Sequence, residues 1–137
     1  MTNKVLCATD GTGHSEHAVA LAAALSSKLG AGLTVCTVNV ARGGTRGPFI
    51  YDHDDGEVKS ILDKAAAQAR KAGAKTVEEV ALKAREAASA IVQYAEENGF
   101  DHIVTGTGDK HGVSRLVLGS VAADVASRAH CTVTVAR

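Results

Sequence analysis

The stretch TGTGDKHGVSRLVLGSVAAD, residues 105–124, places four glycines and several basic side chains between an apolar strand pattern and an amphipathic helix pattern. A glycine-rich loop that leads into a helix suits a phosphate group, because its N–H groups can approach closely and the helix N-terminus carries partial positive charge. Ser120 is expected to cap this helix and could also hydrogen-bond an anion. The loop could equally serve only as a turn with a cap, so the stretch alone leaves both interpretations open.

Around this stretch, strand and helix patterns alternate along the chain. Apolar or β-branched runs predict five strands, at residues 4–9, 33–40, 76–82, 101–105 and 131–136. Apolar positions at helical spacing predict four helices, within residues 18–29, 58–69, 88–95 and 121–129. Three of these helices are followed by a glycine, which adopts a left-handed conformation at little cost (Gly30, Gly73 and Gly99). The alternation predicts one doubly wound α/β domain over residues 1–137, with a five-stranded parallel sheet and helices on both faces.

Residues 41–55, ARGGTRGPFIYDHDD, have no periodic pattern. Their glycines, single proline and charges predict a long, mobile loop. The acidic cluster at its end resembles a metal site, but Asp54 or Asp55 is expected to cap the second helix instead. His14 and His17 are three residues apart on the first helix without an evident third ligand, and we expect them on a solvated face.

Composition restricts the partners. The 137 residues include 15 basic and 15 acidic side chains, so no overall field attracts nucleic acid or a membrane surface, and neither is expected as a partner. No apolar run approaches the roughly 20 residues that a membrane span needs. The three cysteines, Cys7, Cys36 and Cys131, are dispersed, which is typical of free thiols in a reducing compartment. We therefore expect a cytoplasmic protein.

A ligand site is expected where the winding of the sheet reverses, because open α/β sheets bind ligands outside the carboxyl ends of their strands. Under an assumed strand order of 3-2-1-4-5, this crevice opens between the first and fourth strands. The first strand is followed by the turn at residues 10–13, DGTG, and the fourth by residues 106–109, GTGD. Two glycine-rich turns are thus expected to converge on one crevice.

Four segments resemble the UspA-type universal stress proteins, and together they cover essentially the whole chain. Residues 10–18 resemble the family's opening D-G-[ST]-x-x-S-x-x-A, and residues 91–97 and 101–104, IVQYAEE and DHIV, resemble its third helix and fourth strand. Residues 112–122, GVSRLVLGSVA, are the strongest match. Residues 130–135, HCTVTV, resemble the final strand, although Thr132 stands where proline is common.

The resemblance implies a parallel sheet of order 3-2-1-4-5 in a homodimer, and ATP as a ligand, with or without Mg²⁺. The predicted final strand has an edge of alternating Thr and Val that could pair across a two-fold axis. Family members that bind ATP carry G-x2-G-x9-G-[ST]. In this chain Gly106 takes the first position, Gly119 and Ser120 take the last pair, and Asp109 replaces the second glycine.

Asp109 opposes phosphate binding. A carboxylate about 4 Å from a phosphate costs about 1 kcal/mol per charge pair in water and about 4 kcal/mol at an effective dielectric constant of about 20. Asp109 could instead hold Mg²⁺ against the phosphates, and Lys110, His111 and Arg115 could offset its charge. The alternative is a homodimeric interaction module of the UspA type that binds no nucleotide.

By position, the resemblance implies that the backbone of Val38 contacts adenine and that Asp10 lies near the ribose. It further implies that the remaining binding residues line the pocket edge or the phosphate loop (Ala8, Thr9, Gly106, Gly108, Asp109, Gly119, Ser120 and Val121). Val38 could instead be an ordinary core residue, and Asp10 a turn residue bonded to its own backbone.

Catalytic patterns are sparse. The sequence contains no G-x4-G-K-[ST] loop and no G-x-S-x-G turn, and Ser15, Ser114 and Ser120 have no identifiable base. We expect a regulatory or stress-response protein with, at most, slow ATP hydrolysis or autophosphorylation.

Overall fold

The centre of the sheet is formed by β1 (Lys4–Ala8) and β5 (His102–Gly106) in the computed structural model, which describes residues 3–107 and 118–137. β1 pairs with β2 (Gly32–Gly43), which pairs with β4 (Val77–Ala84), and β5 pairs with β6 (Thr132–Ala136). All four pairings are parallel. The five parallel strands therefore run β4-β2-β1-β5-β6, which confirms the predicted fold class and the order of these strands, while an antiparallel sixth strand extends the predicted five-stranded sheet.

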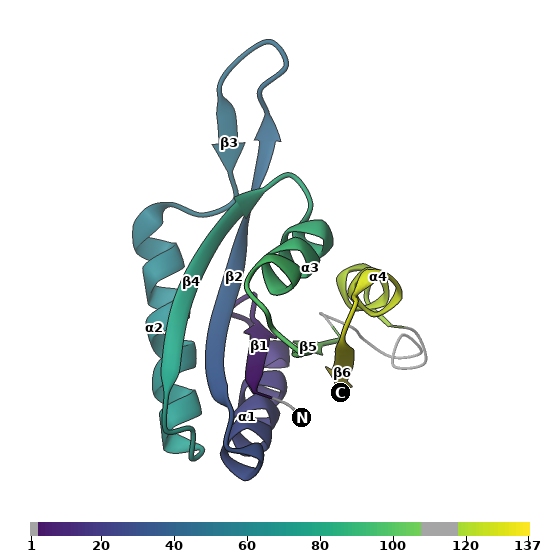
Figure 1. Cartoon of the computed structure of the whole chain (residues 1–137). Coiled ribbons are helices and arrows are strands. Elements are labelled where there is room, and N and C mark those ends of the chain that lie inside the picture. The colour runs from purple at the N-terminus through teal and green to yellow at the C-terminus, as the bar shows by residue number, and fades with distance from the viewer. Residues whose placement is uncertain (1–2, 108–117) are drawn as a thin grey trace.

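Helices cover both faces of the sheet (Figure 1). α1 (Gly13–Leu29) and α2 (Asp55–Lys71) lie on one face, and α3 (Ala87–Glu97) and α4 (Ser120–Arg128) lie on the other. Successive side chains of β1 point to opposite faces of the sheet. Val5 and Cys7 pack in the core cluster on the side of α1 and α2, and Leu6 packs in the cluster on the side of α3 and α4. None of the helices in the described part of the chain is long and apolar enough to cross a membrane.

The predicted ends of three helices and the predicted cap of α2 agree with the structure. Gly30 ends α1 with φ of 65°, and Gly73 and Gly99 also have positive φ. Asp54 caps α2 through a reciprocal pair of hydrogen bonds, in which the N–H of Glu57 donates to Asp54 Oδ1 at 2.7 Å and the N–H of Asp54 donates to Glu57 Oε1 at 3.1 Å.

No cluster of three metal-ligating side chains forms within residues 3–107 and 118–137.

The three cysteines are free thiols, as predicted. Cys7 and Cys36 are fully buried in the two core clusters. Burial raises the pKa of the Cys36 thiol to about 12, so this thiol stays protonated and unreactive at neutral pH.

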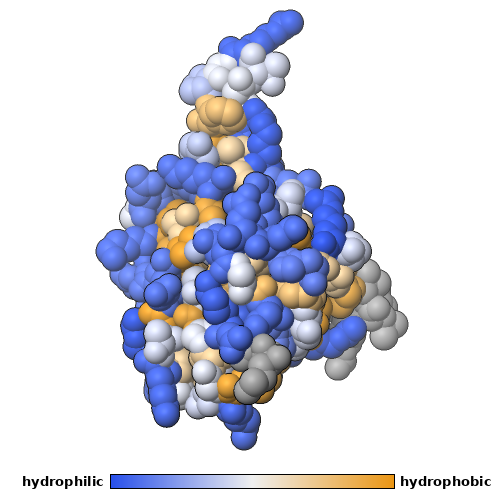
Figure 2. Space-filling view, viewed as in Figure 1, coloured by the Kyte–Doolittle hydropathy of each residue, from blue (hydrophilic) through white to orange (hydrophobic). Residues whose placement is uncertain are grey.

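The prediction of an irregular loop at residues 41–55 is wrong for much of that segment. β2 continues to Gly43, and the chain returns as the antiparallel strand β3 (Phe49–Tyr51). Arg42 clamps the base of this hairpin, because its Nε and Nη2 donate to the two carboxylate oxygens of Asp52 at 2.9 and 3.2 Å. The hairpin projects from the body of the molecule (Figures 1 and 2). Its exposed apolar side chains are Phe49, Ile50 and Tyr51.

Candidate functional site

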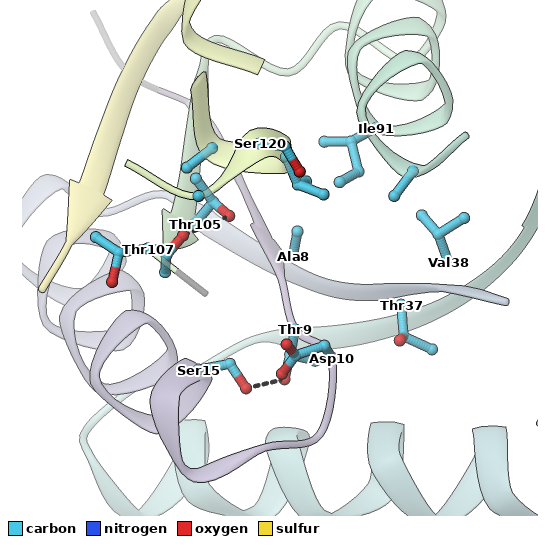
Figure 3. Close-up of a pocket in the computed structure, with 15 residues that line it drawn as sticks. Ala8, Thr9, Asp10, Ser15, Thr37, Val38, Ile91, Thr105, Thr107 and Ser120 are labelled. Carbon is cyan, nitrogen blue, oxygen red and sulfur yellow. Dashed lines mark hydrogen bonds between the residues drawn. The ribbon is translucent and has the colours of Figure 1, made fainter. Parts of the chain in front are cut away.

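A pocket of about 260 Å³ opens at the carboxyl ends of β1 and β5 (Figure 3). The last residue pair between β1 and β5 is Ala8 with Thr105, and beyond it the two strands separate. β1 leads into α1 on one face of the sheet, whereas β5 leads towards α4 on the other. This divergence leaves the crevice that a doubly wound sheet provides for a ligand.

Eight of the ten predicted site residues line this pocket: Ala8, Thr9, Asp10, Val38, Gly106, Gly119, Ser120 and Val121. The other two, Gly108 and Asp109, lie outside the described residues. The sequence interpretation did not include seven further lining residues, which are Ser15, Thr37, Ala87, Ile91, Thr105, Thr107 and Ala122. Ser15 had a signal, because it belongs to the D-G-T-x-x-S pattern of the first turn, and Ala122 had one as part of the matching segment at residues 112–122.

Hydrogen bonds hold the floor of the pocket in place. Thr9 Oγ1 lies 2.8 Å from Ser15 Oγ, and the N–H of Gly11 donates to Thr9 Oγ1 at 3.2 Å. Thr12 donates to Asp10 Oδ1 twice, from its N–H at 2.9 Å and from its hydroxyl at 2.6 Å. Asp10 is therefore a turn residue, as one interpretation proposed, and at the same time lines the pocket.

The charge of Asp10 is fixed by the same bonds. Burial acts to raise the pKa of this carboxyl, but hydrogen bonds from Thr12 and Ser15 to its ionised form outweigh burial, and the pKa lies below its ordinary value. Asp10 is thus ionised at neutral pH. It places one negative charge at the edge of the pocket.

Gly11 is required by a close approach of the turn to α2. Its φ is 81°, and a Cβ at this position would lie 2.8 Å from Ile61 Cγ1. A larger residue would therefore meet both an unfavourable backbone conformation and a steric clash. This explains the Asp-Gly sequence after β1.

The backbone of Val38 is left open at the edge of β2. The pairing of β1 with β2 ends at Cys36, whose carbonyl accepts the N–H of Thr9 at 2.9 Å. Because alternate residues of a strand direct their N–H and C=O groups to the same edge, Val38 directs both groups beyond the end of β1. Farther along that edge, the N–H of Asp52 bonds the carbonyl of Val40 at 3.1 Å. Val38 therefore presents a donor and an acceptor in the gap between these two contacts.

The opposite end of the pocket is the start of α4. Gly119 is the N-cap residue, and its N–H donates to the carbonyl of Thr107 at 2.9 Å. Its own carbonyl accepts the N–H of Ala123 at 2.9 Å. The prediction that Ser120 caps the helix is wrong, because the N-cap position is Gly119 and Ser120 is already the first helical residue.

The N–H groups of the first turn of α4 have no intrahelical partner, and Gly119 has no side chain that could accept from them. These are the amides of Ser120, Val121 and Ala122, all of which line the pocket. The exposed hydroxyl of Ser120 lies beside them. Together with the partial positive charge of the helix end, this arrangement suits one anionic group.

The wall towards α3 is apolar. Ile91 and Ala87 come from the first turns of α3, and the side chain of Val38 comes from β2. Arg128 Nη1 at the end of α4 contacts Glu86 Oε1 before α3 at 3.0 Å, which ties the two helices together. A planar apolar ring could lie against this wall while its edge reaches the backbone of Val38.

Comparison with known proteins supports the resemblance seen in the sequence. A family model described as the Universal stress protein family matches residues 1–137. A universal stress protein of Methanocaldococcus jannaschii is 31% identical over an alignment 147 residues long, gaps included. The alignment covers 98% of this chain and 81% of that protein.

Solved structures agree. A universal stress protein in complex with cAMP superposes with a TM-score of 0.80 at 26% identity, over 99% of this chain and 97% of that chain. The universal stress protein from Archaeoglobus fulgidus in complex with dAMP gives a TM-score of 0.75 at 28% identity, over 100% of this chain and 98% of that chain. The family match, the relative and the shared fold lead to one conclusion: the chain belongs to the universal stress protein family.

Proposed function

We propose that the pocket binds an adenine nucleotide. The observation that carries the proposal is that one pocket is lined by two sets of backbone groups. These are the N–H and C=O groups of Val38, beyond the pairing of β2 with β1, and the first amides of α4, which no side chain in the described part of the chain caps. Two similar universal stress proteins are known in complex with cAMP and with dAMP, and this supports the proposal.

In the proposed complex, the adenine edge pairs with Val38, because adenine offers an acceptor nitrogen beside an amino donor. The ring lies against Ile91 and Ala87. A ribose hydroxyl donates to the Asp10 carboxylate, and a phosphate accepts hydrogen bonds from the first amides of α4. AMP, cAMP and ATP share the adenosine part, and ATP with or without Mg²⁺ is the form that the sequence resemblance implies.

Calorimetric titration of the full chain with AMP, cAMP and Mg²⁺-ATP tests this function. We expect one ligand per chain, and a melting temperature that rises with ligand concentration, because binding to the native state at about 100 Kd adds about 2.7 kcal/mol to stability. UTP is the matched control, since its base lacks the adenine edge. If no adenine nucleotide produces heat or a thermal shift, the proposal fails and the interaction module that binds no nucleotide replaces it.

We further propose that nucleotide occupancy regulates a partner surface as part of a stress response. The ligand would contact α3 and α4 together, and these helices are linked by the contact between Arg128 and Glu86. A ligand that favours one arrangement of the two helices shifts the population towards it.

We also propose that two copies of the chain form a homodimer by pairing through β6. Among the described strands, β6 pairs only with β5, and its sequence TVTVA leaves Val133, Thr134 and Val135 half-buried at the sheet edge. Such an edge is a template for pairing with a second copy across a two-fold axis. Light scattering at micromolar concentration is expected to give twice the chain mass of 14.0 kDa. A mass of one chain would contradict the dimer.

A further inference from the structure

We propose that the free edge of β4 pairs with β4 of a second copy of this chain, antiparallel and across a two-fold axis at Ala81. Among the described strands, β4 pairs only with β2, so its outer edge is open. This edge lies on the opposite side of the sheet from β6 (Figure 1). The contact is therefore separate from the dimer proposed at β6 and from the nucleotide pocket.

The backbone of β4 offers hydrogen-bonding groups along its open edge. The N–H of Leu33 in β2 donates to the carbonyl of Thr76 at 3.1 Å, so the carbonyl of Thr76 points towards β2. Because alternate residues of a strand direct their N–H and C=O groups to the same edge, residues 78, 80, 82 and 84 also point towards β2, and residues 77, 79, 81 and 83 point outwards. An open edge on a strand of eight residues is a template for a further strand.

The side chains of β4 fit a second copy in one register. With the axis at Ala81, Glu79 of each copy lies opposite Lys83 of the other, and two small methyl groups meet at the axis. These three exposed residues line the groove beside α2. On the other face, Val80 of each copy lies opposite Leu82 of the other, and both are half-buried apolar side chains. Charged pairs thus form on one face and apolar pairs on the other.

Neighbouring registers lack this match. An axis at Val80 places Ala81 opposite Glu79, and an axis at Leu82 places Ala81 opposite Lys83. An axis at Glu79 or at Lys83 places like charges directly opposite each other, which destabilises a strand pair. Charge therefore selects the register centred on Ala81.

The surroundings of Glu79 favour an additional cation. Desolvation raises the pKa of Glu79, and the neighbouring carboxyl of Asp63 raises it further, because like charges oppose ionisation. Lys59 and Arg70 act in the opposite direction without cancelling these effects. Lys59 is shared with Asp63, since its Nζ lies 3.3 Å from Asp63 Oδ2. A lysine of a second copy beside Glu79 would offset the repulsion from Asp63.

Lys83 is accessible to a second copy. Its Nζ lies 3.8 Å from Asp55 Oδ1 and 4.9 Å from the centre of the Tyr51 ring, and 55% of its side chain is exposed. Contacts of this kind at a surface are weak. Lys83 can therefore exchange them for the carboxylate of Glu79.

The contact is expected to be weaker than a permanent dimer. Because exposed ion pairs contribute little to affinity, we expect pairing through β4 at roughly 0.1–1 mM chain and not at micromolar concentration. The mass expected from the β6 dimer at micromolar concentration is thus unchanged.

Disulfide cross-linking of the full chain in this concentration range tests the proposal. Ala81→Cys places one thiol on each side of the axis, with Cα atoms about 5.5 Å apart, which a disulfide can span. Glu78→Cys is the matched control, because residue 78 is also exposed on β4 but its two copies would lie about 20 Å apart along the paired strands. The native chain gives the background from Cys131, a half-buried free thiol.

We expect Ala81→Cys to form a covalent dimer roughly tenfold faster than Glu78→Cys, because its thiols are held within bonding range. Equal rates would overturn the proposal and leave the nucleotide site and the β6 dimer standing, since neither depends on this edge.

Charge variants in the Ala81→Cys chain test the register. Lys83→Glu places two glutamates opposite each other, and Glu79→Lys places two lysines opposite each other. We expect each variant alone to cross-link as slowly as Glu78→Cys, and an equimolar mixture of the two to recover the fast rate, because every glutamate then faces a lysine. Thermal melts establish that both variants fold. Fast cross-linking by the separate variants, or no recovery in the mixture, would overturn the proposed pairing.

Discussion

The Gly119→Val variant is expected to bind adenine nucleotides roughly 100-fold more weakly than the native chain, a loss of about 2.7 kcal/mol. Gly119 is buried, lines the pocket and immediately precedes the amides that would meet the phosphate. Its φ of −61° and ψ of 156° are open to any residue, so valine does not strain the backbone. We expect its branched side chain to occupy space in the pocket that the phosphate would need.

The fold should survive this change. Valine is a poorer N-cap residue than glycine, and we expect a loss of about 1 kcal/mol in the free energy of unfolding. Gly47→Val is the control, because a Cβ at Gly47 would meet nothing within 4 Å and this residue is not part of the pocket lining. Titration with AMP compares the two variants. Native affinity in Gly119→Val would remove the start of α4 from the proposed site.

The Asn39→Leu variant is expected to lower the free energy of unfolding by about 2–4 kcal/mol. Asn39 is 2% exposed, and its side chain makes two hydrogen bonds with the backbone of His53: Nδ2 donates to the carbonyl at 2.7 Å, and Oδ1 accepts the N–H at 2.9 Å. Leucine is similar in size to asparagine but leaves the N–H and the carbonyl of His53 without their side-chain partner. The lost bonds are those that hold the returning chain of the hairpin against β2.

Asn98→Ala is the matched control for this prediction. Asn98 is exposed, and its Nδ2 donates to the carbonyl of Tyr94 at 2.9 Å in the same kind of bond. Because water replaces an exposed bond, we expect a loss of less than about 1 kcal/mol. Urea denaturation followed by circular dichroism measures both variants. Equal losses in the free energy of unfolding would show that burial of the Asn39 amide does not strengthen its contribution to stability.

The parallel sheet and its helices could be predicted from the sequence because their signals are local. Helical spacing, glycines such as Gly30 at helix ends and the acidic cap at Asp54 each act within a few residues, and the structure contains all of them. β3 could not be predicted in this way. It is only three residues long, and the bonds on either side of it, Asn39 with His53 and Arg42 with Asp52, span 14 and 10 residues, beyond the reach of the helix and cap signals.

The pocket was predicted as far as its residues belong to a recognisable turn or loop. Asp10 and Gly106 flank the ends of β1 and β5, and the strand order alone brings them to one crevice. Thr37 and Ile91 gave no such signal, because a buried threonine in a strand and an isoleucine on a helix are ordinary core residues. Gly119 and not Ser120 is the cap because the helix begins one residue earlier than the sequence suggested.

The backbone of Val38 shows what the structure adds. The sequence resemblance implied a contact with adenine at this position, and the structure supplies a physical reason to propose it. Pairing with β1 stops at Cys36, and the next contact on that edge is the bond from Asp52 to Val40. The donor and acceptor of Val38 therefore lie between two occupied positions. That they bind a base stays a prediction, as do the roles of Gly108 and Asp109.

A crystal structure of the full chain with AMP tests the central claim most directly. We predict the adenine edge within about 2.7–3.2 Å of the N–H and C=O of Val38, and the phosphate at a similar distance from the amides of Ser120 and Val121. Density for AMP at another surface, or a base turned away from Val38 with the phosphate distant from α4, would contradict the account.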